Sequence, residues 1–252
     1  MGRISKAELE KQKRKFIEKY TPYQLTFYSE FDFSILEKTI LYHKKAGRGR
    51  TVTYNDIIIM ADTETSKQKV NSFKYVEKEI NGAVVKLKKY NPTPNHVVAW
   101  TISLRAFHKN IATLYGNTPT EFIDCLTRLR EVLKGEEIYI YWHNLSYDWV
   151  FIRRHMFQKF GHPEHQLNTK SHYPIYIKFA NGIVFRDSLC LAQRKLEGWA
   201  ESLDVEHKKA VGKWDYNKIR HQHGTWFNSG ELEYIECDTL AGVECIDALM
   251  LA

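Results

Sequence analysis

The sequence lacks the features that mark membrane-spanning, secreted or disulfide-stabilised proteins. No apolar run approaches the ~20 residues that a helix needs to cross a bilayer. The first ten residues carry charge where a signal peptide has its apolar core. Four cysteines occur among 252 residues, and no two of them form a CxxC pair. We therefore expect reduced thiols, a cytoplasmic location, no secretion and no membrane partner.

Several catalytic and metal-binding patterns are also missing. The histidines between His155 and His223 have no cysteines at zinc-finger spacing, so we expect them at the surface or in loops. Ser188 stands in no Gly-x-Ser-x-Gly elbow, so a serine hydrolase has no support. Gly47 and Gly49 belong to a basic stretch, not to a phosphate-binding loop after a strand.

Positive charge is concentrated at the N-terminus. The net charge is +7, and residues 1–50 contain 12 Lys/Arg against 6 Asp/Glu, whereas the other 202 residues contain 25 against 24. Such a segment suits a phosphate-binding face, although a merely soluble charged helix explains the charge equally well. We expect a basic helical N-terminal extension over residues 1–50 and the main domain over residues 51–252.

Hydrophobic periodicity predicts mixed strands and helices around a central sheet, and hence an α/β domain. Expected helices cover residues 6–19, 34–46, 119–134, 189–203 and 231–251, with a further helix after Ser146. Expected strands cover residues 57–61, 96–104, 111–115 and 137–142, with a hairpin formed by 173–179 and 183–185. Residues 66–95 are expected to form a polar insertion. Thr118 and Glu121 have the spacing of a helix capping box.

Two carboxylates follow the hydrophobic strand predicted at residues 57–61. Asp62 and Glu64 are two residues apart, and on a strand such side chains share one face. Two carboxylates held this close repel each other unless a positive charge, usually a divalent cation, lies between them. An isolated Asp-x-Glu is more often a solvated strand end, so the rest of the chain has to decide.

Two further segments carry acidic residues that suit the same site. Asn144, Tyr147 and Asp148 follow the strand predicted at 137–142, and the helix dipole favours an acid at Asp148 whatever its role. Tyr234 and Asp238 are four residues apart in the last predicted helix and so share a face. Each segment alone is weak evidence. The helix dipole would explain an acid at Asp148, and a pair at the protein surface would explain Tyr234 and Asp238.

Taken in order, the three segments resemble the three exonuclease motifs of the DEDD superfamily. The matching patterns are Asp62-x-Glu64, Asn144-x-x-Tyr147-Asp148 and Tyr234-x-x-x-Asp238. They resemble the tyrosine subclass, because the histidine subclass has His five residues before the last aspartate, where this chain has Glu233. Residues 141–152 resemble the second motif of protein-primed family B DNA polymerases of small bacteriophages and linear mobile elements. The similarity covers residues 57–250.

This resemblance implies a ribonuclease-H-like (DnaQ-like) exonuclease fold, with a central mixed sheet flanked by helices. It implies a metal-dependent 3′→5′ exonuclease of the proofreading type, located in the cytoplasm of a bacterial host or associated with a virus. Two Mg²⁺ or Mn²⁺ ions would be the cofactors. Asp62 would bridge both ions, Glu64 and Asp238 would complete the first site, and Asp148 would support the second. Tyr234 would position the attacking water.

The resemblance also implies a set of residues that hold the nucleic acid. Thr65, Asn144 and Tyr147 would hold the 3′-terminal nucleotide. Ser188 and Leu189, in a segment that resembles the family's single-strand-binding motif, would contact the strand further back.

The family also places a lysine near the scissile phosphate. Lys213 and Lys209 are the candidates in this chain. We assign Lys213 to the catalytic residues and Lys209 to the nucleic-acid contacts, and either one fits the family's lysine.

The chain departs from the family in two ways, which leave its context open. No polymerase motifs follow the third motif, and residues 1–50 and 66–95 exceed the minimal pattern. We expect an enzyme that hydrolyses single-stranded or frayed DNA 3′ ends, as part of a protein-primed DNA polymerase or derived from one. A polymerase domain and a terminal protein are its expected partners.

Two alternatives to this function stay open. One is a non-catalytic module that binds single strands or a terminal protein. The other is a 3′→5′ exoribonuclease, because the sequence does not reveal how the 2′-OH would be recognised.

Overall fold

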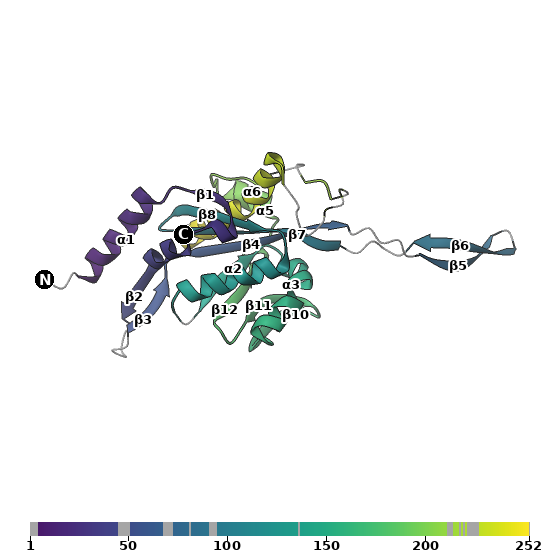
Figure 1. Ribbon diagram of the computed structural model, residues 1–252, viewed down its shortest axis with the longest axis horizontal. Helices are drawn as coiled ribbons and strands as arrows, with labels where there is room; N and C mark the ends of the chain where they lie inside the picture. Colours follow the sequence, from purple (N-terminus) through teal and green to yellow (C-terminus); the bar gives the residue numbers. More distant parts are fainter. Residues whose placement is uncertain are drawn as a thin grey trace.

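The computed structural model describes residues 5–44, 51–67, 73–80, 82–90, 95–135, 137–210, 214–216, 218, 220 and 227–251. Within them, eight strands form one mixed sheet in the order β1-β8-β7-β4-β9-β12-β11-β10, with helices on both faces (Figure 1). These strands are β1 (Gln24–Phe27), β4 (Ile58–Lys67), β7 (Asn95–Ala106), β8 (Lys109–Gly116), β9 (Ile138–Trp142), β10 (His165–Lys170), β11 (Tyr173–Lys178) and β12 (Ile183–Asp187). The predicted α/β fold, a central mixed sheet flanked by helices, is confirmed.

Strand β4 lies in the middle of the sheet, antiparallel to β7 and parallel to β9. Its side chains alternate between two hydrophobic layers, with Ile59 and Ala61 in one and Met60 in the other. Because helices cover both faces of this strand, its sequence is a continuous apolar run and not an alternation of apolar and polar residues. The strand extends beyond the predicted 57–61, and its register with β7 shifts by one residue after Glu64.

Helices cover the two faces of the sheet. α2 (Pro119–Val132) and α3 (Leu145–Phe160) pack on one face, and α5 (Leu196–Ser202) and α6 (Ser229–Leu251) pack on the other. The capping box of Thr118 and Glu121 starts α2 as predicted. None of the helices in the described ranges is long and apolar enough to cross a membrane.

The predicted helix at 34–46 is wrong. The chain forms a 3-10 helix, η2 (Phe33–Thr39), and then strand β2 (Ile40–Lys44), which pairs with β3 (Thr51–Asn55). The spacing of the apolar residues fits a helix, but β2 is stabilised by backbone pairing with a strand more distant in sequence, which local periodicity does not reveal.

The predicted helix at 189–203 is also wrong as a single element. It divides into α4 (Leu189–Ala192) and α5, because the chain turns at Gln193, whose φ of 52° is left-handed and cannot continue a helix. Strand β10, at the edge of the sheet, was not predicted. The hairpin of β11 and β12 is confirmed, with Gly182 at a φ of 84° in its turn.

The N-terminal region takes part in the main sheet and core. Helix α1 (Lys6–Tyr20) matches the prediction for 6–19, and β1 pairs in parallel with β8 at one edge of the sheet. Ile17, Phe33 and Leu36 are buried in the same hydrophobic layer as α2 and α3. The division of the chain into two domains at residue 50 stays a prediction.

Strands β5 (Phe73–Ile80) and β6 (Ala83–Tyr90) form a separate two-stranded antiparallel sheet within the insertion predicted at 66–95. In the chain they lie between the central strands β4 and β7. Figure 1 shows them as an arm that projects from the end of these two strands, away from the rest of the molecule.

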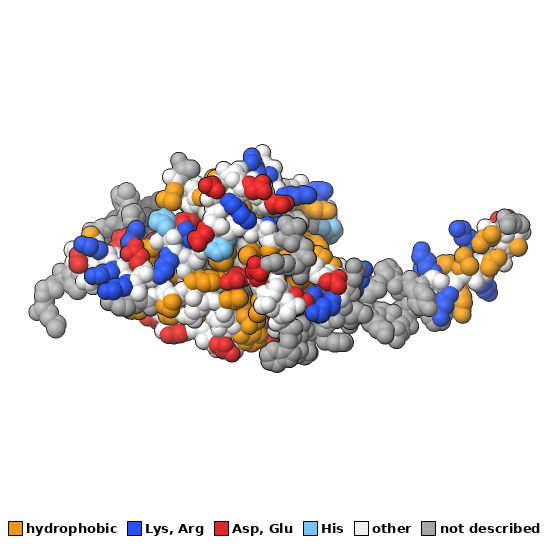
Figure 2. Space-filling model, turned by 90° about the horizontal axis from the view of Figure 1, so that it is seen from above, with side chains coloured by type: hydrophobic (Ala, Val, Ile, Leu, Met, Phe, Trp, Pro, Cys, Tyr) orange, Lys and Arg blue, Asp and Glu red, His pale blue; other side chains and the backbone are white. Residues whose placement is uncertain are grey.

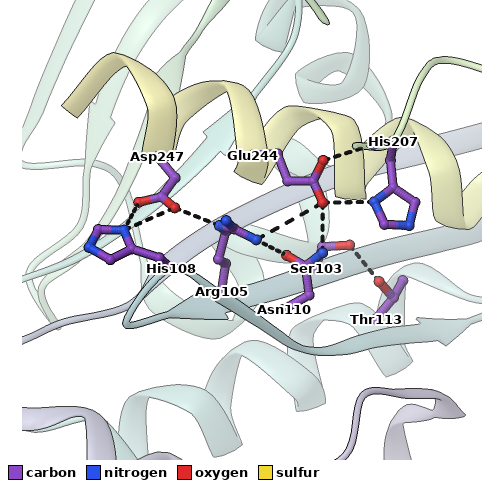
Figure 3. A network of polar contacts seen from close by, with 8 residues as sticks. All are labelled: Ser103, Arg105, His108, Asn110, Thr113, His207, Glu244 and Asp247. Carbon is purple, nitrogen blue, oxygen red and sulfur yellow. Dashed lines mark hydrogen bonds and ion pairs between the residues drawn. The ribbon is translucent and has the colours of Figure 1, made fainter. Parts of the chain in front are cut away.

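A polar network ties α6 to the sheet (Figure 3). On β7, Arg105 donates from Nε to Asp247 Oδ2 over 2.7 Å. On β8, Asn110 donates from Nδ2 to Glu244 Oε1 over 2.7 Å, and the His207 backbone N–H donates to Glu244 Oε2 over 2.9 Å. Buried acids are stable in a core when they are paired and hydrogen-bonded in this way. The network therefore fixes the position of α6 on the sheet.

Candidate active site

Three elements bring the predicted acidic residues to one edge of the sheet. Asp62 and Glu64 lie on β4, Asp148 lies in the first turn of α3 just after β9, and Asp238 lies on α6. Because β4 and β9 are parallel neighbours, their carboxyl ends meet at the same edge. Helix α6 packs across β4 and β7 and so places Asp238 over that edge.

A cavity of about 340 Å³ opens at this edge. Its lining includes the four acids and most of the other residues that the sequence predicted for the site. The lining residues are Asp62, Thr63, Glu64, Thr65, His143, Asn144, Tyr147, Asp148, Lys209, Tyr216, Tyr234 and Asp238. Residues more than 170 positions apart in the sequence therefore share one pocket.

Three of the four carboxylates form a tight cluster. One oxygen each of Asp62, Glu64 and Asp238 lies within 4.8 Å of the others. Glu64 and Asp238 are buried, so water screens their mutual repulsion poorly. Hard divalent cations prefer such sets of oxygen ligands. These three residues could therefore hold a metal ion.

The fourth acid, Asp148, is held by the middle residue of the first motif. Its Oδ1 accepts hydrogen bonds from the backbone N–H of Thr63 over 3.1 Å and from Thr63 Oγ1 over 2.5 Å. Burial raises the pKa of Asp148 to about 7, against the effect of these two hydrogen bonds. Thr63 thus connects β4 to the N-terminus of α3 inside the cavity.

The cluster carries more negative charge than its surroundings neutralise. Burial, followed by the charges of Asp148 and Glu64, raises the pKa of Asp62 well above its ordinary value. Burial and the charge of Asp238 raise the pKa of Glu64 to about 8. A bound cation would reverse both shifts, because it stabilises the ionised carboxylates. The electrostatics therefore favour cation binding.

Lys209 places a positive charge directly beside this cluster. Its Nζ lies 2.9 Å from Asp238 Oδ2. Burial opposes the charge of Lys209, but Asp238 more than offsets it, and the pKa of Lys209 is raised. The other oxygen of Asp238, Oδ1, is shielded from solvent and accepts no hydrogen bond from any described residue. A buried acceptor without a donor is the arrangement expected of a metal ligand.

Tyr234 lies four residues before Asp238 on α6 and faces the cavity. Its hydroxyl lies 3.2 Å from the hydroxyl of Tyr216, and its ring stacks on Trp214 with 6.1 Å between centroids. Burial, followed by the charge of Glu64, raises the pKa of Tyr234, so its hydroxyl stays protonated. The phenol can therefore donate a hydrogen bond into the cavity.

The residues predicted to hold the terminal nucleotide also line the cavity. Thr65 Oγ1 and the Tyr147 hydroxyl are 2.9 Å apart, and the Tyr147 ring is 45% exposed. Asn144 precedes α3 with a left-handed φ of 75°, and its backbone N–H donates to Asp187 Oδ1 over 3.1 Å. The exposed ring offers a stacking surface beside the acids.

The remaining predicted site residues lie elsewhere. Ser188 and Leu189 do not line the cavity, and the buried Ser188 hydroxyl donates to the carbonyl of Trp142 over 3.1 Å. Their contact with a single strand stays a prediction. Lys213, the predicted catalytic lysine, lies outside the described residues.

Sequence reasoning missed several residues of this site. Thr63 stands between the two acids of the first motif, but its role depends on the approach of α3. Tyr216 lies in an irregular segment with no periodic pattern. The ring of His143 contacts Ser188 Oγ over 3.1 Å, and burial lowers its pKa to about 4, so it is neutral. Asp187 comes directly before the predicted Ser188 and Leu189, and its hydrogen bond with the backbone N–H of Asn144 depends on the pairing of β12 with β9.

The fold and cavity define an α/β domain with an acidic pocket compatible with a metal ion at the edge of its central sheet. No known protein-family model matches the chain, and no curated protein sequence matches it. Solved structures of phi29 DNA polymerase do match it. The complex with single-stranded DNA has a TM-score of 0.55 and 17% identity over 78% of this chain and 31% of that chain.

Two further structures of phi29 DNA polymerase give the same picture. The ternary complex with primer-template DNA and incoming nucleotides has a TM-score of 0.55 and 16% identity, over 79% of this chain and 31% of that chain. The orthorhombic crystal form has a TM-score of 0.54 and 16% identity, over 77% of this chain and 31% of that chain. These likenesses show a related fold, and the chain spans less than a third of the polymerase that it matches.

Proposed function

We propose that this protein is a metal-dependent 3′→5′ exonuclease of the tyrosine subclass of the DEDD superfamily. The observation that carries the proposal is the meeting of Asp62, Glu64, Asp148, Asp238 and Tyr234 in one cavity. An accidental sequence match would not bring residues from β4, α3 and α6 to the same pocket. The fold likeness to phi29 DNA polymerase supports the proposal without identifying the activity.

The four acids are the proposed metal ligands. Asp62, Glu64 and Asp238 would hold one Mg²⁺ or Mn²⁺, and Asp62 with Asp148 would hold the second. When bound, such ions neutralise phosphate charge and make a coordinated water acidic enough to attack. The all-oxygen donor set and the unpartnered Asp238 Oδ1 fit a hard cation.

The other residues of the cavity would orient the reacting groups. Tyr234, kept protonated by burial, would donate its hydroxyl hydrogen to the attacking water, with Tyr216 and Trp214 holding the ring in place. Lys209 lies beside the acids with its positive charge and would stabilise the negative phosphate at cleavage. Lys213 keeps its proposed catalytic role on the resemblance alone.

The wall formed by Tyr147, Asn144 and Thr65 would hold the last nucleotide. A base can stack on the exposed ring of Tyr147, and such stacking tolerates any base. A cavity of about 340 Å³ suits an unpaired end better than a duplex, so we propose single-stranded or frayed DNA 3′ ends as substrates. Ser188 and Leu189 would contact the strand further back.

The wider context is also a proposal. Two of the named solved structures are of a DNA polymerase bound to single-stranded or primer-template DNA, and the chain corresponds to 31% of that protein. We propose that this protein proofreads for a protein-primed DNA polymerase, or derives from one, with a polymerase domain and a terminal protein as partners.

A digestion assay tests this function directly. Single-stranded DNA and RNA oligonucleotides of one sequence, labelled at the 5′ end, are incubated with the protein in Mg²⁺, in Mn²⁺ and in EDTA. We expect a ladder that shortens from the 3′ end of DNA with either metal and no digestion in EDTA. Asp62→Ala and Asp148→Ala should each abolish the ladder, with circular dichroism unchanged.

Other outcomes of this assay would replace the proposal. Preference for the RNA oligonucleotide would establish an exoribonuclease. Tight binding of the DNA without cleavage in either metal would establish a non-catalytic single-strand-binding module. Cleavage that survives in the Asp62→Ala, Asp148→Ala double variant would exclude this cavity as the active site.

A further inference from the structure

The arm of β5 and β6 is not used by the proposed chemistry, although in the chain it lies between β4, which carries two of the acids, and β7. Strand β4, which carries Asp62 and Glu64, ends at Lys67, and β7 begins at Asn95 on the other side of the arm. Each strand of the arm has eight residues, a length of roughly 26 Å. In Figure 1 the arm projects outward from the end of β4 and β7.

The register of the arm sorts its side chains onto two faces. Directly paired residues of an antiparallel ladder lie on the same face, and successive pairs alternate. The pairs Lys74–Lys89, Val76–Leu87, Lys78–Val85 and Ile80–Ala83 therefore share one face, called here the lysine face. The pairs Tyr75–Lys88, Glu77–Lys86 and Glu79–Val84 share the other, called here the mixed face.

The two faces differ in charge. The lysine face carries Lys74, Lys78 and Lys89 and has no acidic residue among its described positions. On the mixed face, Lys86 Nζ lies 3.5 Å from Glu77 Oε1, and Glu79 adds a second negative charge. Figure 2 shows basic side chains beside hydrophobic ones along the arm. The lysine face is thus an uncompensated positive surface.

Both faces of the arm carry apolar side chains that are open to solvent, including Tyr75 and Val84 on the mixed face, so charge is what distinguishes the lysine face. Ile80, Val85 and Leu87 are 41%, 38% and 39% exposed, and an isolated two-stranded hairpin is at best marginally stable in water. Exposed aliphatic residues on a ribbon that has no core of its own indicate a surface that a partner covers. The charge of the face requires a partner that is negative along a length comparable to the arm.

We propose that the lysine face binds double-stranded DNA behind the 3′ end that the cavity holds; this inference rests on the proposed function. The three lysines contact backbone phosphates, and the aliphatic residues between them face the groove. A two-stranded ribbon fits the major groove of B-DNA, which is about 12 Å wide. Phosphates recur about every 3.4 Å along each strand, so the arm spans roughly eight of them.

The arm thus gives the enzyme a hold on DNA that does not depend on the terminal nucleotide. Phosphate contacts are independent of sequence, so the arm binds any duplex and allows it to move along the arm as nucleotides are removed.

The experiment compares two double variants with equal charge change. Lys74→Gln with Lys89→Gln alters the lysine face, and Lys86→Gln with Lys88→Gln alters the mixed face.

Binding is measured by fluorescence anisotropy in EDTA, where no metal-dependent cleavage occurs, at several salt concentrations. The probes are a duplex with a short 3′ overhang, a single strand of the same length and vesicles of anionic lipid. For the lysine-face variant we expect duplex affinity to fall on the order of 30-fold at 0.15 M salt, with a salt slope smaller by about 1.8. The mixed-face variant should stay within about threefold of the parent.

Equal losses in the two variants, a loss confined to the single strand, or face-dependent binding to vesicles but not to duplex would each overturn the inference. Digestion of a tetranucleotide, too short to reach the arm, separates this inference from the proposed function. Parent and lysine-face variant should digest it equally. If neither cleaves any DNA while the face-dependent duplex binding persists, the proposed function fails and the role of the arm stands.

Discussion

Thr63 holds Asp148 through two hydrogen bonds, one from its backbone N–H over 3.1 Å and one from its hydroxyl over 2.5 Å. Both residues are buried, and they lie 85 positions apart on β4 and α3. Partners of this kind orient a metal-binding carboxylate and are often as important as the ligand itself. Thr63 is therefore a positioning residue for the proposed site.

Removal of the Thr63 hydroxyl should weaken metal use without unfolding the protein. Thr63→Val keeps the shape and the backbone N–H but leaves Asp148 with one donor. We expect 10–100-fold lower activity, with a higher Mg²⁺ concentration needed for half-maximal rate. Thr63→Ser retains a hydroxyl and should stay close to the parent. Equal metal dependence in all three proteins would refute this role.

The positive charge of Lys209 should matter most when no metal is bound. It lies 2.9 Å from Asp238 and offsets part of the repulsion among the three clustered acids. Lys209→Met should lower the melting temperature in EDTA at pH 8, and Mn²⁺ should restore most of the loss. Lys195→Met, an exposed lysine at the start of α5, should show neither effect. A loss that Mn²⁺ does not reduce would mean that Lys209 serves packing alone.

The network below α6 should make stability depend on pH through Glu244 and His207. Burial works against the charge of Glu244, but hydrogen bonds from His207 and Asn110 more than offset it and lower its pKa to about 2. This stabilisation is present above the unfolded pKa of 4.5 and is lost as the pH falls toward 2. The hydrogen bond to Glu244 raises the pKa of His207. The stability that this shift contributes is therefore fully present below pH 6.5, the unfolded pKa of His207, and is lost at higher pH.

Glu244→Gln should therefore lower the free energy of unfolding by about 2 kcal/mol. The difference from the parent should be greatest between pH 4.5 and 6.5 and smaller on either side. Chemical denaturation at a series of pH values measures it, with Glu201→Gln, an exposed glutamate of α5, as control. A difference that stays constant from pH 3 to 9 would contradict the assigned charges.

Close packing between α6 and β4 should make Gly242 sensitive to substitution. A Cβ at this position would lie 2.7 Å from Met60 Cε and 2.8 Å from Met60 Cγ. We expect Gly242→Ala to destabilise the protein by about 1–3 kcal/mol, because the core has little room to adjust. The cost should shrink in a Met60→Ala background, as measured by a double-mutant cycle. Additive effects would show that these side chains do not compete for space.

The sequence was most informative where local chemistry and tertiary structure agree. The buried run before Asp62 becomes a strand because the sheet covers both of its faces, and the Thr118–Glu121 spacing forms the predicted capping box. The resemblance to the three exonuclease motifs likewise implied which acids would meet at the cavity. The first two signals lie within a few residues of the features that they predict, whereas the third depends on the resemblance.

Other features depend on contacts that no short pattern encodes. Residues 40–44 become a strand through pairing with β3, and the chain turns at Gln193 within an otherwise helical pattern. Thr63 and Tyr216 join the site through the approach of distant elements. The insertion at 66–95 was expected to be polar and its hairpin was not predicted; among the described elements, β5 and β6 pair with each other and project away from the main sheet (Figure 1).

Titration with Mn²⁺ tests the central claim most directly, because it asks whether the clustered acids hold cations at all. Isothermal calorimetry at pH 7.5 compares the parent with Asp62→Ala, Asp148→Ala and Asp204→Asn, an exposed control. The parent and the control should bind two ions per chain, Asp148→Ala one, and Asp62→Ala one or none. A parent that takes up no Mn²⁺, or an Asp62→Ala variant that binds it like the parent, would contradict the account.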